Sequence, residues 1–135
     1  MKAVRVVHKR PGMKKTCLIL SLALFGACST SATDIGDAQV NGQTIHVARE
    51  GDMPAAGVTT TIVFKATTGT KPDSIKGWVG LEEVESAAKI AAVYDANDGD
   101  FDDDLTCPTP LPEGSKIWFE VTTGETVTTA SVAIK

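Results

Sequence analysis

Short runs rich in threonine and valine, separated by Gly, Pro and Asp, fill most of the chain from Val40 onward. β-Branched residues favour strands, and breaker residues about ten apart are typical of short antiparallel strands. The pattern predicts seven strands, at 39–48, 58–67, 74–80, 88–94, 101–107, 115–122 and 126–134. A single sheet of that size would leave an apolar face in water. We therefore expect an all-β fold, a single β-sandwich over residues 39–135.

One stretch also fits a helix. In residues 81–89, Leu81, Val84 and Ala88 recur at helical spacing among good helix formers. A short helix between two strands is therefore the alternative for this segment.

The segment from Pro110 to Val121 combines a turn containing Pro and Gly with an alternating aromatic strand. It resembles the approach to the sixth strand of fibronectin type III and related immunoglobulin-like domains. The resemblance departs from the family at Ile117, which stands where those domains carry a tyrosine whose hydroxyl bonds the backbone. It implies an immunoglobulin-like sandwich and no functional residue.

A hydrophobic segment near the N-terminus indicates export. Lys14 and Lys15 precede an apolar run over 17–25, and small residues follow it. These are the parts of a secretory signal. The residues Phe25-Gly26-Ala27-Cys28 resemble the lipobox of bacterial lipoproteins, with Phe25 where Leu is usual. The resemblance implies that residues 1–27 are a cleaved signal peptide and that Cys28 is lipidated and becomes the first residue of the mature chain.

The same resemblance implies a location in the bacterial cell envelope, anchored by lipid. Ser29 after the lipidated cysteine implies sorting to the outer membrane of a Gram-negative cell, on its periplasmic face or at the cell surface. Residues 28–38 have few large apolar groups, and we expect a flexible tether there. Residues 1–12 fit an unused upstream start. An ordinary secretory signal cleaved after Ala27 or slightly further on, or an uncleaved anchor, remain the alternatives.

Charge narrows the range of partners. The chain has 13 basic and 17 acidic residues. Removing residues 1–27 takes away six basic residues and no acidic one, which leaves seven against 17, a formal net charge of −10. Such a surface repels nucleic acid, so we expect no nucleic-acid partner.

The sharpest local feature is the acidic stretch from Tyr94 to Asp104. The oxygen-bearing candidates for a Ca²⁺ site are Asp95, Asn97, Asp98, Asp100, Asp102 and Asp104. Calcium takes six to eight oxygen ligands, although the spacing here misses that of an EF-hand. The alternative is a solvated hairpin around Asp98-Gly99, with Asp103 on the face of Phe101 and Leu105 unless a bulge turns it outward.

Three other residues are candidates for chemistry or binding. Cys107 is expected to be a small packed hydrophobe, with an exposed thiol that pairs between chains as the alternative. His46 alternates with Ile45 and Val47 and should lie on the polar face of its strand. If Ile117, Phe119 and Val121 face inward, Trp118 faces outward and is the best anchor for a partner.

The expected function is that of a lipid-anchored envelope protein without catalytic activity. It would act as a binding or structural accessory module for an envelope protein or glycan of unknown identity, with the membrane engaged through the N-terminal lipid. The alternative is a Ca²⁺-dependent binding module that uses the acidic loop 95–104. No other cofactor is expected.

Overall fold

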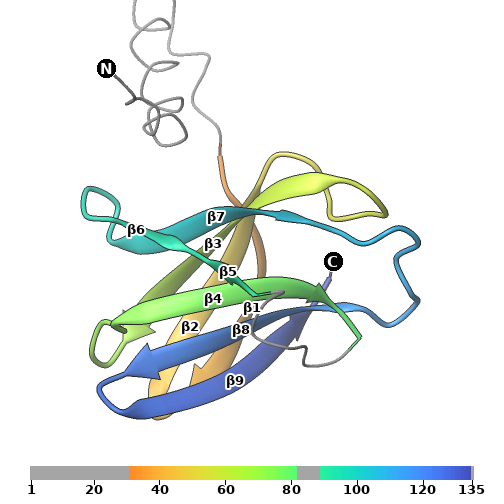
Figure 1. Ribbon diagram of the computed structural model, residues 1–135. Helices are drawn as coiled ribbons and strands as arrows, with labels where there is room; N and C mark the ends of the chain where they lie inside the picture. The colour runs from red at the N-terminus through yellow and green to blue at the C-terminus, as the bar shows by residue number, and fades with distance from the viewer. Residues whose placement is uncertain (1–30, 82–88, 135) are drawn as a thin grey trace, which may run out of the picture. The chain divides into compact units, whose positions relative to one another are not determined.

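The computed structural model describes residues 31–81 and 89–134. These residues form nine antiparallel strands and no helix (Figure 1). The strands are β1 (Thr33–Val40), β2 (Gln43–Glu50), β3 (Thr59–Thr68), β4 (Ser74–Gly80), β5 (Ile90–Ala91), β6 (Val93–Asp95), β7 (Asp100–Thr106), β8 (Lys116–Thr123) and β9 (Thr126–Ala133). The helix considered for 81–89 and the leader with Cys28 lie outside the described residues, apart from Leu81 and Lys89.

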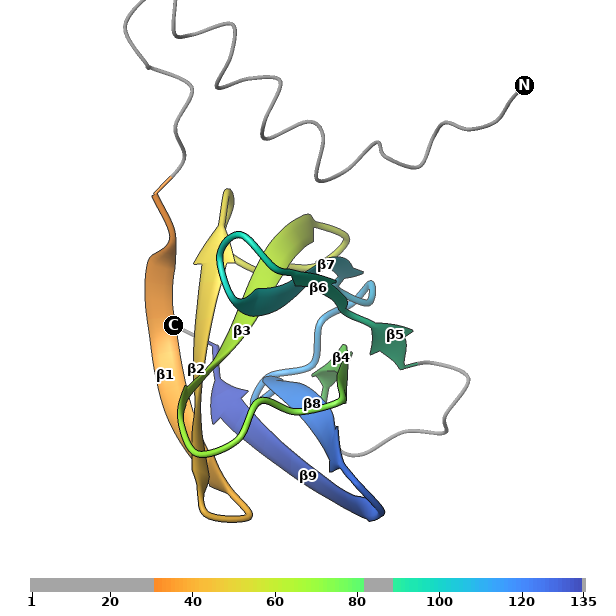
Figure 2. The same cartoon turned by 90° about the vertical axis from the view of Figure 1, so that its left-hand side faces the viewer.

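The strands build two sheets, in the orders β1-β2-β3-β7-β6 and β5-β4-β8-β9. Figure 2 shows the two layers, with β1 and β2 on one side and β8 and β9 on the other. The segment β2-β3-β7-β6 and the sheet β5-β4-β8-β9 follow the strand order of immunoglobulin-like sandwiches. The predicted all-β sandwich is confirmed, with nine strands in place of seven.

The first additional strand lies within the predicted tether, so that prediction was wrong for residues 33–38. β1 pairs with β2, and a register shift between Asp34 and Gly36 leaves Ile35 buried at 2% exposure. Ile35 and Val40 are the two fully buried apolar side chains of β1. They are enough to hold β1 in the sheet because pairing with β2 gives its backbone N–H and C=O groups hydrogen-bond partners. The predicted strand 39–48 also runs through a turn, since Asn41 (φ 49°) and Gly42 (φ 78°) form the two-residue connection between β1 and β2.

The second additional strand arises because the predicted strand 88–94 is divided between the sheets. β5 pairs with β4, whereas β6 pairs with β7. Ala92 lies between them and donates its backbone N–H to the Ile75 carbonyl, 2.9 Å away. The apolar run therefore spans a change of sheet, and its large side chains Ile90, Val93 and Tyr94 are exposed, whereas Ala92 between the two strands packs partly against the core.

The core lies between the inner faces of the two sheets. Phe64 of β3 and Phe119 of β8 meet across it with ring centroids 5.2 Å apart. Gly77 makes room for this contact, because a Cβ at Gly77 would lie 3.0 Å from the Phe64 ring. The other inward side chains with no exposed surface are Ile45, Val47, Ile62, Ile75, Ile117 and Val121.

Three connections gather at one end of the sandwich, which we call the loop end. They are the β1–β2 turn, the β3–β4 loop and the β8–β9 turn (Figures 1 and 2). Asn41 Nδ2 donates to Thr128 Oγ1 across 2.7 Å and so ties the β1–β2 turn to β9. The loop end is therefore held together by contacts between both sheets.

Candidate functional site

The acidic candidates do not converge on one point. Among the described residues, no group of three or more His, Cys, Asp or Glu side chains is arranged to hold a metal ion. Asp100, Asp102 and Asp104 alternate along β7, and Asp95 ends β6, with Asn97 and Asp98 in the turn between these strands. Alternate residues of a strand are spaced about 7 Å apart along it, which spreads the carboxylates out. Asp95 Oδ1 instead accepts the Asn97 backbone N–H at 2.8 Å, as in a local turn.

Asp100 is nevertheless electrostatically unusual. Burial, followed by the neighbouring carboxylates of Asp98 and Asp102, raises the pKa of Asp100 to about 6. Lys65 opposes this shift and donates from Nζ to the Asp98 carbonyl at 3.0 Å. The turn thus contains one carboxyl group that ionises reluctantly, beside one lysine.

Asp103 keeps its place in the register of β7. It pairs with Ile62 with no bulge between them, so its side chain lies on the inner face but is only half-buried. Its Oδ1 accepts the backbone N–H of Asp104 at 2.7 Å. Partial exposure and this hydrogen bond offset the cost of an inward carboxylate.

Trp118 faces outward from β8, because Ile117, Phe119 and Val121 are all inward and fully buried. The Trp118 ring stacks on Trp78 of β4, with centroids 6.3 Å apart and planes 8° apart. Trp118 Nε1 donates to the Gly80 carbonyl at 3.1 Å. Since its polar atom and part of its ring are engaged within the protein, Trp118 offers a partner less surface than the sequence implies.

A buried ion pair adjoins this tryptophan pair. The Lys89 side chain is only 6% exposed, and its Nζ lies 2.8 Å from Glu120 Oε2. The same Nζ lies 4.9 Å from the Trp78 ring centroid. The desolvated charges thus have partners, and they help to fix the outer face of this sheet.

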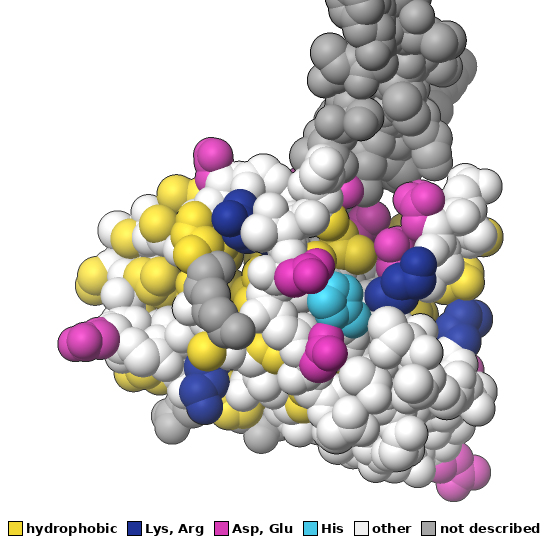
Figure 3. Space-filling view, turned by 180° about the vertical axis from the view of Figure 1, so that it is seen from behind, with side chains coloured by type: hydrophobic (Ala, Val, Ile, Leu, Met, Phe, Trp, Pro, Cys, Tyr) yellow, Lys and Arg dark blue, Asp and Glu magenta, His cyan; other side chains and the backbone are white. Residues whose placement is uncertain are grey.

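His46 lies on the outer face of β2, as predicted, between two carboxylates. Nδ1 is 2.5 Å from Asp37 Oδ1, and Nε2 is 3.1 Å from Asp34 Oδ1. Figure 3 shows the histidine flanked by acidic side chains on this face. The hydrogen bond with Asp37 raises the pKa of His46, with smaller contributions from Asp34. Both ring nitrogens are therefore occupied.

Cys107 is packed at the end of β7, which confirms its prediction as a hydrophobe. Its exposed fraction is 2%, and burial raises the pKa of its thiol. Its backbone N–H donates to the Val58 carbonyl, and its carbonyl accepts from Gly57. The exposed thiol considered as an alternative is not found.

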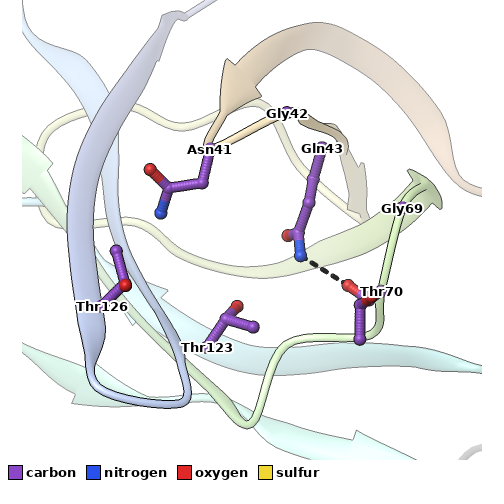
Figure 4. Close-up of a pocket in the computed structure, with 7 residues that line it drawn as sticks. All are labelled: Asn41, Gly42, Gln43, Gly69, Thr70, Thr123 and Thr126. Carbon is purple, nitrogen blue, oxygen red and sulfur yellow. Dashed lines mark hydrogen bonds between the residues drawn. The ribbon is translucent and has the colours of Figure 1, made fainter.

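A cavity at the loop end was not predicted. Its volume is about 570 Å³, and it is lined by Asn41, Gly42, Gln43, Gly69, Thr70, Thr123 and Thr126. We call it the loop-end pocket. Figure 4 shows that these residues come from the three connections gathered there. Each lining residue is polar or glycine, and none carries a charge.

Two oxygens in the loop-end pocket are buried without a hydrogen-bond partner among the described residues: Gln43 Oε1 and Thr123 Oγ1. Gln43 is 4% exposed, and its Nε2 donates to the Thr70 carbonyl at 2.6 Å. Buried polar atoms without partners are rare and costly. Both oxygens lie beneath the pocket lining with almost no accessible surface, and Arg49 Nε, away from the pocket, is a third such atom among the described residues.

The sequence held one signal for this pocket. Asn41-Gly42 is a strong two-residue hairpin signal, and it places Gln43 at the start of a strand. The approach of the β3–β4 and β8–β9 connections depends on how the two sheets stack, which no local pattern encodes.

Comparison of the chain with protein-family models, curated proteins and solved structures finds no match in any of the three. Within residues 31–81 and 89–134, no helix is long and apolar enough to cross a membrane.

Proposed function

We propose that this chain is a lipid-anchored, non-catalytic binding module of the bacterial cell envelope. The observation that supports the binding role is the loop-end pocket, a polar and uncharged depression formed where three connections meet. Connections at the end of a β-sandwich are held by a rigid scaffold and commonly bind ligands. The pocket has a volume within the range usual for small-molecule sites.

The anchoring role rests on the N-terminal sequence. Lys14, Lys15 and the apolar run 17–25 have the order of an export signal, and Phe25-Gly26-Ala27-Cys28 resembles a lipobox. An acylated Cys28 would hold the domain at a membrane surface and raise its concentration near envelope partners. Ser29 favours the outer membrane as the site of anchoring.

The non-catalytic role is supported by the two residues that were considered for chemistry. Cys107 is buried and its thiol pKa is raised, which disfavours the reactive thiolate. His46 has a carboxylate on each ring nitrogen, so neither nitrogen is positioned to take a proton from a hydroxyl nucleophile.

Metabolic labelling with an alkyne analogue of palmitate tests the anchoring role. We expect the wild-type chain to be labelled, Cys28→Ser to lose the label completely, and the matched control Cys17→Ser to keep it, because Cys17 leaves with the signal. A label that persists in Cys28→Ser, or a wild-type chain that takes up none, would overturn the anchor.

The binding role is tested separately by ¹⁵N nuclear magnetic resonance titration of residues 29–135 with small neutral ligands such as glucose and N-acetylglycine methylamide. We expect saturable shifts of the Gly42 and Gly69 amides with at least one ligand, and shifts that saturate with none would overturn the binding role of the loop-end pocket.

A further inference from the structure

The strand directions divide the connections of the sandwich between its two ends. β1 runs from Thr33 to the loop end, and β2 returns from there. By the same alternation, the β2–β3 loop (residues 51–58) and the β7–β8 connection (residues 107–115) lie at the opposite end (Figures 1 and 2). We call it the N-terminal end, because β1 begins there.

The two segments of the N-terminal end form one surface. The Gly57 N–H donates to the Cys107 carbonyl at 3.2 Å, and the Cys107 N–H donates to the Val58 carbonyl at 2.9 Å. A Cβ at Gly57 would lie 3.1 Å from Thr109 Oγ1, so the segments also touch further along. The N-terminal end is therefore a continuous surface joined to the strands beneath it.

This surface carries little charge. The charged residues of 51–58 and 107–115 are Asp52 and Glu113, and Met53 is 42% exposed. The other exposed residues of both segments are glycine, alanine, proline and threonine.

The outer face of the sheet β1-β2-β3-β7-β6 is much more highly charged. Its charged or titratable side chains include Asp34, Asp37, His46, Lys65, Asp102 and Asp104. Placing such groups against a lipid surface removes water from them, which costs free energy. The N-terminal end therefore meets a bilayer at a lower cost than this face does.

The length of the link to Cys28 restricts which end of the sandwich can face a membrane. Four residues, 29–32, separate Cys28 from Thr33, and fully extended they span at most about 14 Å. β1 has eight residues and is about 26 Å long. With the loop end against the bilayer, the link would have to run back along β1, nearly twice its full reach.

From these lengths and charges we propose that the N-terminal end rests against the lipid bilayer and that the loop end faces away from it. This inference rests on the proposed lipid anchor at Cys28 and adds the surface through which the domain meets the membrane. The partner is a zwitterionic lipid surface, because anionic headgroups repel Asp52, Glu113 and a mature chain of net charge −10. The loop-end pocket then lies about 26 Å further from the bilayer than the N-terminal end.

Fluorescence quenching in vesicles tests this orientation with the lipidated chain. Bimane is attached to single cysteines, at Met53→Cys and Glu113→Cys on the N-terminal end and at Thr70→Cys and Glu125→Cys on the loop end. All four positions are exposed. Cys107 is 2% exposed and Cys28 would be acylated, so the wild-type chain should take up little label. The vesicles are phosphatidylcholine, part of which carries a nitroxide quencher on its headgroup.

The two ends should differ strongly in quenching. We expect Met53→Cys and Glu113→Cys to lose most of their fluorescence to the nitroxide lipid, and Thr70→Cys and Glu125→Cys to lose little. Equal quenching at both ends, or stronger quenching at the loop end, would overturn the orientation.

Two further labels test whether the sandwich lies on a face. Lys65→Cys and Lys76→Cys lie on the outer faces of the two sheets, since Lys65 pairs with His46 and Lys76 pairs with Glu120. Both should lose much less fluorescence than Met53→Cys. Quenching at either position that matches Met53→Cys would show a sandwich lying on that face and would overturn the proposal.

A longer link tests the cause of the orientation. A flexible Gly-Ser insertion of about 15 residues between Ser31 and Ala32 exceeds the length of β1 when extended, so the domain could turn. We expect the quenching at Met53→Cys to fall toward the value at Thr70→Cys. Unchanged quenching would overturn the role of the short link.

Flotation of the same vesicles separates this inference from the lipid anchor. The wild-type chain should float with the vesicles, and Cys28→Ser should not. A wild-type chain that stays behind would overturn the anchor and the orientation together. A chain that floats, with labels quenched alike at both ends, would overturn the orientation alone.

Discussion

Polar groups have opposite surroundings on the outer face of the sheet β1-β2-β3-β7-β6 and at the loop-end pocket. On the outer face, His46 lies between Asp34 and Asp37, and Thr61 donates to Asp104 at 2.6 Å. In the pocket, Gln43 and Thr123 hold neutral oxygens that are buried and have no partner in the described protein. The face is rich in charge and paired, whereas the pocket lacks charge and is unpaired. Pairing offsets the cost of the polar groups on the outer face, whereas the two buried oxygens lower stability because nothing in the described protein bonds them.

The variant with the largest expected effect on this contrast places a charge at the pocket. Gln43→Glu places a buried carboxylate against the Thr70 carbonyl, with no cation in the lining. We expect a loss of about 3 kcal/mol in unfolding free energy at about pH 7, and a smaller loss where the carboxyl is protonated and can donate. Urea unfolding at about pH 7 and at an acidic pH where the carboxyl is protonated measures both losses in unfolding free energy. Gln39→Glu on exposed β1 is the matched control and should change stability little. Equal effects at both positions would refute the contrast.

A smaller test removes one hydroxyl from each region. Thr123→Val deletes an oxygen without a partner, so the free protein should gain about 1 kcal/mol of stability. Thr61→Val deletes the donor to Asp104 and should cost about 0.5 kcal/mol, since the site is exposed. Thermal and urea unfolding of both variants give the signs. A destabilised Thr123→Val would show that its hydroxyl is already bonded within the folded chain.

The sequence predicted the sandwich because alternation in strands such as 115–122 records which residues are inward. Ile117, Phe119 and Val121 were identified as the inward set, and their burial confirms it. The acidic run also stood out, because charges close in sequence are conspicuous. Their separation along β7 follows from the extended backbone, which a ligand count over ten residues ignores.

What the sequence did not predict depends on contacts between distant segments. β1 has few apolar residues, and its stability comes from pairing with β2 after the Asn41-Gly42 turn. Gln43 and Thr123 are 80 positions apart in the sequence. They face one cavity only because two sheets stack, so their unpaired oxygens cannot be recognised before the fold is known.

On the acidic hairpin, neutralising one carboxylate should stabilise the protein. The folded-state pKa of Asp100 is raised from 3.8 to about 6 by burial and by Asp98 and Asp102. Its charge therefore lowers stability, with the full effect above the folded value and none below the unfolded value. Asp100→Asn should gain about 0.5–1 kcal/mol at about pH 7, after allowance for solvent screening, and nothing at about pH 3. A gain that does not change with pH would contradict this origin. Asp98→Asn, in the adjoining turn, should give a smaller gain of the same kind.

The charge of His46 on the outer face of β2 should stabilise the fold, whereas the charge of Asp100 lowers stability, so at both sites stability declines as pH rises. The hydrogen bond with Asp37 raises the folded-state pKa of His46 above 6.5. Its contribution to stability is therefore full below 6.5 and is lost as pH rises through the raised folded value. For this exposed site we expect a decline of about 0.5 kcal/mol, and Asp37→Asn should reduce it. Urea unfolding at pH values on both sides of this window measures the effect. A wild-type stability that rises over the window would contradict it.

The smallest expected effect is that of calcium, which tests whether the charged region is a site after all. Asp95, Asn97, Asp98, Asp100, Asp102 and Asp104 are spread over β6, the turn and β7, and the described residues hold no metal-binding group of three. We expect millimolar Ca²⁺ to leave the midpoint of thermal unfolding unchanged beyond what equal ionic strength of Mg²⁺ produces, because weak screening is not selective. A selective rise with Ca²⁺ that Asp100→Asn abolishes would reverse the comparison. It would make the acidic hairpin a binding site whose ligands close around the ion only when it is present.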